Sequence, residues 1–116
     1  MIQHISPGPL MSQAVIHNKT VTLSGQIAID DQDADFATQT RAIFARIDSL
    51  LAEAGTDRSH MISANIWITD AGNFGAFNDL WTDWLNGAIP PARATVVSAL
   101  VLPSLKIEIQ VSAAIP

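Results

Sequence analysis

The feature that most constrains the fold is the spacing of the apolar residues, which switches along the chain between a two-residue repeat and a three- or four-residue repeat. Between residues 12 and 26, two runs rich in β-branched residues flank the pair Asn18-Lys19, a pattern that predicts a hairpin. Gly25 interrupts the second run, which indicates a bulge or a close backbone approach. The chain therefore begins with paired strands.

A helical repeat follows this hairpin. Apolar residues recur at three- and four-residue steps from Phe36 to Ala54, after the acidic segment Asp30–Asp35, and the pattern stops at Gly55. We predict an amphipathic helix with an acidic first turn over these residues, because acidic residues at the start and a glycine at the end match the helix dipole and a left-handed stop.

The second half of the chain alternates between the same two repeats. Residues 61–69 alternate apolar and polar side chains and predict a strand. An apolar stripe from Phe74 to Leu85, with Asn73 as its N-cap and Gly87 near its end, predicts a second helix. Because aromatic residues at helical spacing mainly contribute buried area, we assign this stripe to the core and give it no catalytic role.

Two further strands are predicted at residues 93–98 and 106–113, after the rigid pair Pro90-Pro91. The order β-β-α-β-α-β-β predicts an α/β (α+β) fold, in which one mixed sheet carries two helices packed on one face. The length of 116 residues fits a single domain over residues 1–116.

Composition limits the possible functions. Charged residues make up only 15% of the chain, against about a quarter in most soluble domains, which indicates that an oligomer covers part of the surface. The net charge of -5, with six scattered Lys and Arg residues, argues against nucleic acid as a ligand. We expect a cytoplasmic protein outside the membrane, because no signal peptide and no long apolar stretch is present.

Metal chemistry has no recognisable ligand set in this sequence. Cysteine is absent, which removes disulfides and thiolate sites together. The histidines His4, His17 and His60 show no spacing with acidic residues that would form a metal site. We therefore expect no metal.

Two charged residues stand apart in the apolar C-terminal region. After Arg93, the only charged residues are Lys106 and Glu108. On a two-residue repeat, two adjacent strands could direct the Arg93 guanidinium and the Glu108 carboxylate into one cleft. Arg93 would then hold a small anion, and Glu108 would orient or deprotonate a water. Spacing alone favours a plainer alternative, a structural ion pair or a contact with another subunit.

Four short motifs give the chain a family resemblance. They are Ser-Gly-Gln at residues 24–26, Phe-x-x-Phe-Asn at residues 74–78, Pro-Ala-Arg at residues 91–93 and Lys-Ile-Glu-Ile at residues 106–109. In this order and at these separations, the chain resembles the reactive-intermediate deaminase family (Rid, YjgF-like) over essentially its whole length.

The resemblance implies a chorismate-mutase-like fold assembled as a homotrimer, with clefts between subunits. It also implies hydrolysis of enamines and imines, such as 2-aminoacrylate, to 2-keto acids and ammonia without a cofactor or metal. By resemblance, Arg93 would hold the substrate carboxylate and Glu108 would position the attacking water. Ser24 would line the same cleft, and the backbone around Ala94 and Thr95 would contact the substrate.

The chain also departs from the family pattern. Many members carry a tyrosine after the Gly-Pro pair where this chain has Leu10, and many carry a cysteine where it has Thr95. These changes would reshape the pocket and alter the preferred imine. Two alternative functions stay open: a trimeric module that binds small carboxylates without turnover, and the ribonuclease or translation-inhibitor activity of some relatives, which the acidic charge opposes.

Overall fold

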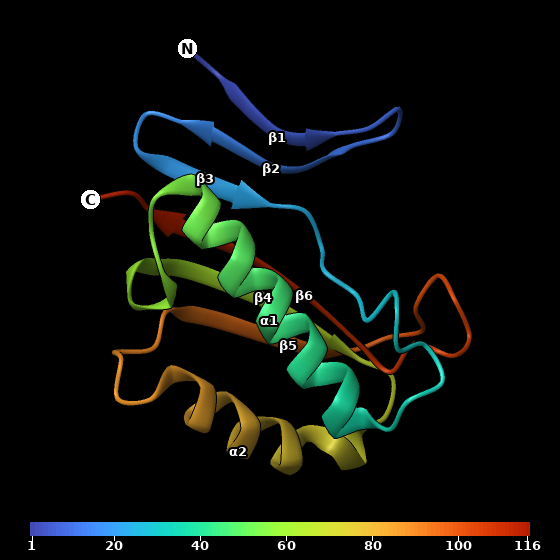
Figure 1. Cartoon of the computed structure of the whole chain (residues 1–116). Coiled ribbons are helices and arrows are strands. Elements are labelled where there is room, and N and C mark those ends of the chain that lie inside the picture. Colours follow the sequence, from blue (N-terminus) through green and yellow to red (C-terminus); the bar gives the residue numbers. More distant parts are fainter.

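The computed structural model describes residues 1–116, and its elements form one six-stranded sheet with two α-helices on one face (Figure 1). In chain order the elements are β1 (Gln3–Pro7), β2 (Ser12–His17), β3 (Thr20–Leu23), α1 (Phe36–Ala54), β4 (Met61–Ile68), α2 (Phe74–Leu85), β5 (Ala92–Val97) and β6 (Ile107–Ala114). Single 3₁₀ turns at Arg58–His60 and Ala71–Asn73 precede β4 and α2.

The strand order is β1-β2-β3-β6-β4-β5, which confirms the predicted mixed sheet. Only β4 and β5 are parallel, and α2 forms the crossover that a parallel pair requires. The predicted hairpin joins β2 and β3, where Asn18 and Lys19 adopt φ values of 50° and 62°. Positive φ at both central residues is the turn geometry that matches the twist of paired strands.

β1 is an additional strand at the beginning of the predicted order. Its only buried side chain is Ile5, so no apolar repeat marks it in the sequence. Pairing with β2 holds this strand in place, since strand formation depends on the neighbouring strand as much as on local preference.

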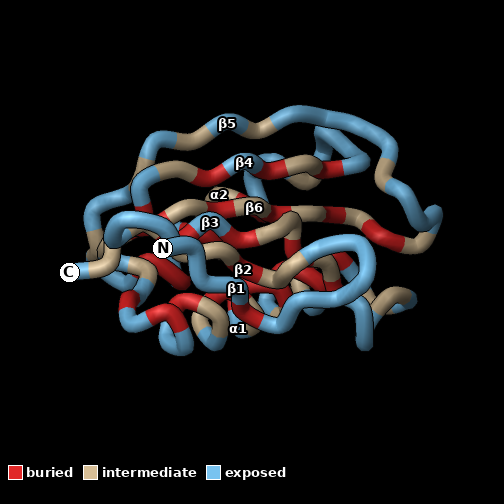
Figure 2. The backbone as a smooth tube through the Cα atoms, turned by 90° about the horizontal axis from the view of Figure 1, so that it is seen from above, coloured by how far each residue is buried: buried red, intermediate tan, exposed pale blue.

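The core lies between the sheet and the helices. Along β6, Ile107, Ile109 and Val111 are buried, whereas the residues between them are half-buried on the other face of the sheet. Figure 2 shows this alternation in β4 and β6, and it shows mostly exposed residues along the edge strand β5. Most of the aromatic stripe of α2 joins this core as predicted, and Phe44 of α1 stacks on Trp84 with 4.3 Å between ring centroids. Phe74, at the beginning of the stripe, is instead 45% exposed.

α1 has the predicted bounds and ends. Gly55 adopts a φ of 89°, the left-handed stop that the sequence indicated. The first turn of α1 carries no acidic side chain; instead Asp35 is the N-cap, and its carboxylate accepts a 2.8 Å hydrogen bond from the backbone N–H of Thr38. The acidic charge therefore stabilises α1 from just outside the helix.

Two local predictions are wrong in detail. Asn73 precedes α2, but its side chain makes no capping hydrogen bond, because a 3₁₀ turn already leads into the helix. Within β4, a register shift between Met61 and Ser63 breaks the strict alternation. Met61 is consequently buried, and Ile62 is 49% exposed.

Candidate functional site

Arg93 lies on β5 and faces α2. It is in register with the buried Ala64 of β4, so its side chain is on the helix-covered face of the sheet. One terminal guanidinium nitrogen donates a 2.8 Å hydrogen bond to the Asn78 side-chain oxygen. The guanidinium carbon lies between 5.4 and 5.8 Å from the ring centroids of three aromatic residues of α2, which are Phe74, Phe77 and Trp81.

These contacts orient the Arg93 guanidinium without neutralising it. Neither of the two ion pairs in the structure includes Arg93, and partial burial lowers the pKa of its guanidinium. Aromatic faces attract a cation and restrict its plane, while the remaining N–H donors stay available for a planar anion. The arrangement suits a carboxylate ligand.

The two residues that follow Arg93 point to opposite faces. Thr95 shares the face of Arg93, and its hydroxyl is the only buried side-chain polar atom without a hydrogen-bond partner. Ala94 is exposed on the other face. Since buried polar atoms normally have a partner, the Thr95 hydroxyl is available to a ligand or an ordered water. Arg93, Asn78 and Thr95 are called the arginine half-site below.

Glu108 lies on β6, on the face of the sheet that no helix covers. It is in register with Trp67 of β4. Burial raises the pKa of the Glu108 carboxyl, because no charged or hydrogen-bonding partner offsets the loss of water. The Glu108 carboxylate lies directly against Gly25, where a β-carbon would overlap its Oε2 atom. The close approach predicted at Gly25 is therefore an approach to Glu108.

Ser24 joins Glu108 through this same segment. The Ser24 hydroxyl donates to the backbone oxygen of Gln13 at 3.3 Å and accepts from the Gln26 side-chain amide at 3.2 Å. Gln26 pairs with Ile109 through two backbone hydrogen bonds of 2.8 and 3.1 Å. These bonds hold residues 24–26 beside Glu108. Glu108, Ser24 and Gly25 are called the glutamate half-site below.

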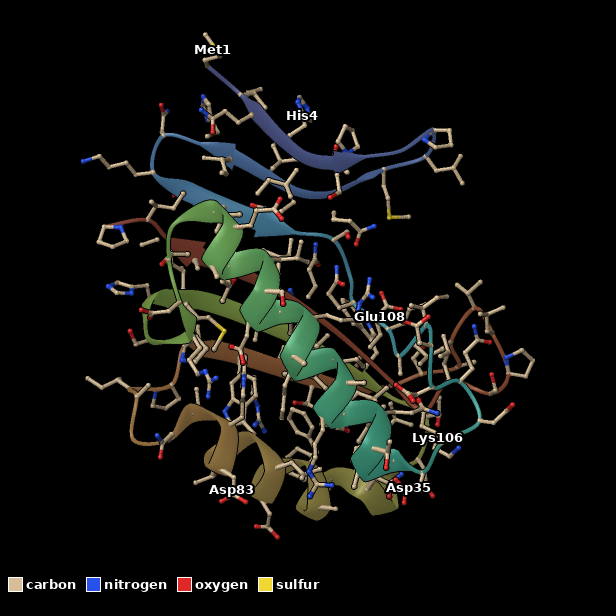
Figure 3. The ribbon with its side chains drawn as sticks, viewed as in Figure 1. Met1, His4, Asp35, Asp83, Lys106 and Glu108 are labelled. Carbon is tan, nitrogen blue, oxygen red and sulfur yellow. The ribbon has the colours of Figure 1, made fainter.

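The two half-sites do not form the common cleft that the sequence predicted within one chain. β4 lies between β5 and β6, so the two strands are not adjacent. Arg93 is on the helix-covered face, whereas Glu108 is on the open face. The sheet itself therefore separates the guanidinium from the carboxylate, and they form no ion pair within the chain. In Figure 3, Glu108 also lies apart from Lys106 and Asp35, which are close to the beginning of α1.

Three residues in or beside the half-sites had no role assigned from the sequence: Asn78 in the arginine half-site, and Gln26 and Arg46 beside the glutamate half-site. Asn78 and Gln26 each belong to one of the four family motifs, and this membership was the only feature of the sequence that could have identified them as site residues. Arg46 of α1 donates from Nε to the Gln26 side-chain oxygen at 3.0 Å. Nothing in its helical spacing identified this contact, because the partner is twenty residues away in sequence.

Two kinds of feature are absent from the structure. No group of three or more His, Asp or Glu residues is placed to hold a metal ion. No helix is both long enough and apolar enough to cross a membrane.

The fold and the two half-sites define a class: an α+β sheet domain with an unpaired arginine on an edge strand and an unpaired glutamate on the opposite face. The family model described as Endoribonuclease L-PSP matches residues 1–115. A RutC family protein of Haemophilus influenzae is 33% identical over 97% of both chains. The RutC family protein YoaB of Escherichia coli is 36% identical over 90% of both chains.

Solved structures give the same assignment. A YjgF family member from Neisseria meningitidis superposes with a TM-score of 0.93 at 34% identity, covering 100% of this chain and 96% of that one. A Rid family protein of unknown function from Yersinia pestis, YyfA, superposes with a TM-score of 0.86 at 34% identity, covering 93% of this chain and 90% of that one. The chain belongs to the YjgF-like (Rid) family.

Proposed function

We propose that this protein is a cofactor-independent deaminase that hydrolyses enamines and imines of amino acids, such as 2-aminoacrylate, in clefts between the subunits of a homotrimer. The observation that carries the proposal is the pair of unpaired, partly desolvated groups Arg93 and Glu108. Unpaired charged groups with shifted pKa values are typical of functional sites.

The position of the two half-sites favours a cleft between subunits. Within one chain the sheet separates Arg93 from Glu108, so they can act on one small substrate only if each comes from a different copy. The low charged fraction of 15% agrees with surface covered in an assembly. β5 is an edge strand with mostly exposed residues, and no helix covers the open face of the sheet, so both are available for such contacts.

The chemistry follows from the groups in each half-site. Arg93 binds the substrate carboxylate with its planar fork of N–H donors, and the Thr95 hydroxyl provides a further polar contact. Glu108 accepts a proton from a water as the water oxygen attacks the C=N carbon. The same proton passes to the nitrogen and gives a carbinolamine. The carbinolamine hydroxyl proton then moves to the nitrogen, the C=O bond forms, the C–N bond breaks, and a 2-keto acid and ammonia leave. An enamine such as 2-aminoacrylate first becomes the imine, by gaining a proton at its CH₂ carbon and losing one from nitrogen. A raised pKa suits Glu108 for both accepting and returning the proton.

The decisive experiment measures keto acid release from imines generated freshly from several amino acids. We expect wild-type protein to accelerate release and Arg93→Ala to lose on the order of 100-fold, because misplacing a substrate can reduce turnover this strongly. Arg41→Ala, which removes an exposed arginine of α1, is the matched control and keeps full activity. A wild-type protein that accelerates none of these imines would rule out the proposal.

The alternative to an enzyme is a module that binds small carboxylates without turnover, and it can be tested on the same protein preparation. It would bind 2-keto acids or benzoate-like anions through Arg93 and release no ammonia. Calorimetric titration beside the imine assay separates the two functions, since only the enzyme gives both signals.

Ribonuclease activity is the second candidate, because the matching family model is described as an endoribonuclease. The net charge of -5 opposes it, since six scattered cations provide no surface for phosphates. We expect the purified protein to leave RNA intact. Salt-sensitive cleavage that disappears in a defined point variant would instead support this activity.

A further inference from the structure

A hollow of about 410 Å³ lies next to the glutamate half-site, between α1 and the first two strands. Residues from these elements and from the segment after β3 line it: Ser6, Gln13, Gln26, Ala45, Arg46, Ser49 and Leu50. Arg46 is the only charged residue in this lining, and no carboxylate contributes to it. The hollow therefore presents a positive charge in a chain whose net charge is -5.

The guanidinium of Arg46 is without an anionic partner. Its Nε donates to the Gln26 side-chain oxygen at 3.0 Å, and its two terminal nitrogens donate to no other group of the chain. Neither ion pair of the structure includes it. The donors left over form the planar fork that binds a carboxylate or phosphate through two parallel hydrogen bonds.

The orientation of Arg46 is set by a buried amide. Gln26 is only 1% exposed, and its side-chain nitrogen donates to the Gln13 side chain and to both oxygens of Ser24 at 3.1 to 3.2 Å. These bonds turn the Gln26 oxygen toward Arg46. A guanidinium held in advance loses less conformational freedom when an anion binds, which favours binding.

The rest of the hollow complements an oxyanion with a short apolar part. The hydroxyls of Ser6 and Ser49 offer further donors, and Leu50 gives an apolar wall. Ser6 adopts a φ of 49°, although it directly precedes Pro7 and the residue before a proline prefers extended backbone. Such strained backbone positions cluster at ligand sites.

Arg46 also lines two smaller hollows. Asp30 and Asp31 line a separate hollow of about 230 Å³ that also reaches Arg46. They form no ion pair with it. An anion therefore meets less repulsion from the side of Ser6 and Ser49, which selects the larger hollow.

We propose that Arg46, held by Gln26, forms a binding site for a small oxyanion, a carboxylate or a phosphate, in the hollow between α1 and the first two strands. The site is separate from the arginine half-site. It does not depend on the proposed deaminase activity, because its measurement is binding and not turnover.

The test is titration of the full-length protein with inorganic phosphate and with propionate, at constant ionic strength, by calorimetry and by the NMR signal of the Arg46 Nε–H. We expect at least one anion to bind saturably and to shift this signal. Arg46→Gln should weaken binding roughly tenfold, as expected for loss of a charge-assisted hydrogen-bonded pair. Phosphate and propionate in separate titrations show which oxyanion the site prefers.

Three variants make the result decisive. Arg41→Gln removes an equal charge from the same helix and should leave binding unchanged. Ser49→Leu fills the hollow while keeping Arg46, and should weaken binding even if Arg46→Gln does not fold. Unchanged binding in Arg46→Gln or in Ser49→Leu overturns the proposal. The proposal is also overturned if Arg93→Ala loses anion binding while Arg46→Gln keeps it, because the anion then binds at the arginine half-site.

Discussion

Gly25 leaves the space that the Glu108 carboxylate occupies. A β-carbon at residue 25 would overlap the Glu108 Oε2 atom, and Gly25 itself does not have a positive φ. The backbone at this position therefore accepts an L-residue, and only the side chain of Glu108 would have to move. A substitution at Gly25 should therefore disturb the position of Glu108 without disturbing the fold.

We expect Gly25→Ala to lower imine hydrolysis by about tenfold or more, since small displacements of a catalytic group reduce turnover strongly. The circular dichroism spectrum should stay unchanged. Gly75→Ala is the control, because a β-carbon there meets nothing within 4 Å. Full activity in Gly25→Ala would show that the position of Glu108 against Gly25 is unimportant for catalysis.

Ionisation of Glu108 should also change how the free energy of unfolding depends on pH. Its pKa in the folded chain is raised above the ordinary value of 4.5, so the ionised carboxylate lowers the stability of the folded state at neutral pH. This loss is relieved as the pH falls through the raised pKa toward 4.5. Glu108→Gln removes the charge, and we expect it to increase the free energy of unfolding at neutral pH.

Urea unfolding at a series of pH values measures this difference between Glu108→Gln and wild type. The difference should shrink as the pH is lowered, and a difference that is constant with pH would contradict the role of the charge. In the activity assay, the same variant should lower kcat more than it raises KM, because the proposed role of Glu108 is at the attacking water.

At the scale of elements, α1 depends on the way it ends. Gly55 adopts a φ of 89° and its N–H binds the carbonyl of Ala52. A β-carbon at Gly55 would meet only the Ile115 methyl at 3.9 Å, an ordinary contact. The cost of a side chain here is therefore the cost of left-handed backbone and not of crowding.

We expect Gly55→Ala to lower the free energy of unfolding by about 1 kcal/mol, the usual penalty for a left-handed alanine. Urea unfolding measures it as a lower midpoint with an unchanged slope. Gly75→Ala, inside α2 and with free space around it, should instead increase stability. Equal midpoints for wild type and Gly55→Ala would contradict this account of the helix end.

At the scale of the whole molecule, the sheet keeps the two half-sites apart in one chain. If the proposed trimer forms, each cleft takes Arg93 from one chain and Glu108 from its neighbour. Chains that lack Arg93 and chains that lack Glu108 can then complement one another. In a closed ring each mixed trimer contains a single cleft with both residues.

We therefore expect Arg93→Ala and Glu108→Gln, each strongly impaired alone, to recover activity when they are unfolded and refolded together. Random mixing predicts about one quarter of wild-type activity, since about three quarters of the trimers are mixed and each has one intact cleft of three. Either variant refolded alone is the control. Absence of recovery, with mixed assembly verified by mass spectrometry, would contradict a site shared between chains.

Much of the fold followed from local pattern. The bounds of α1, the hairpin at Asn18-Lys19 and the alternation of β6 were predictable because each depends on neighbours a few residues apart. β1 was not predictable, because its pairing with β2 determines it. The exposure of Ile62 was not predictable either, because a register shift of β4 against β6 causes it. The sequence also singled out Arg93 and Glu108, since few charges stand in the C-terminal region.

The sequence by itself determined which residues are available for chemistry: one arginine after two prolines, one glutamate in an alternating strand, and a glycine between Ser24 and Gln26. Only the tertiary structure decided where these groups lie relative to one another. Alternation assigns a side chain to one of two faces of its own strand, but long-range pairing decides which strands are neighbours and which face the helices cover. That pairing placed β4 between Arg93 and Glu108, set Gly25 against the glutamate, and brought Arg46 to Gln26.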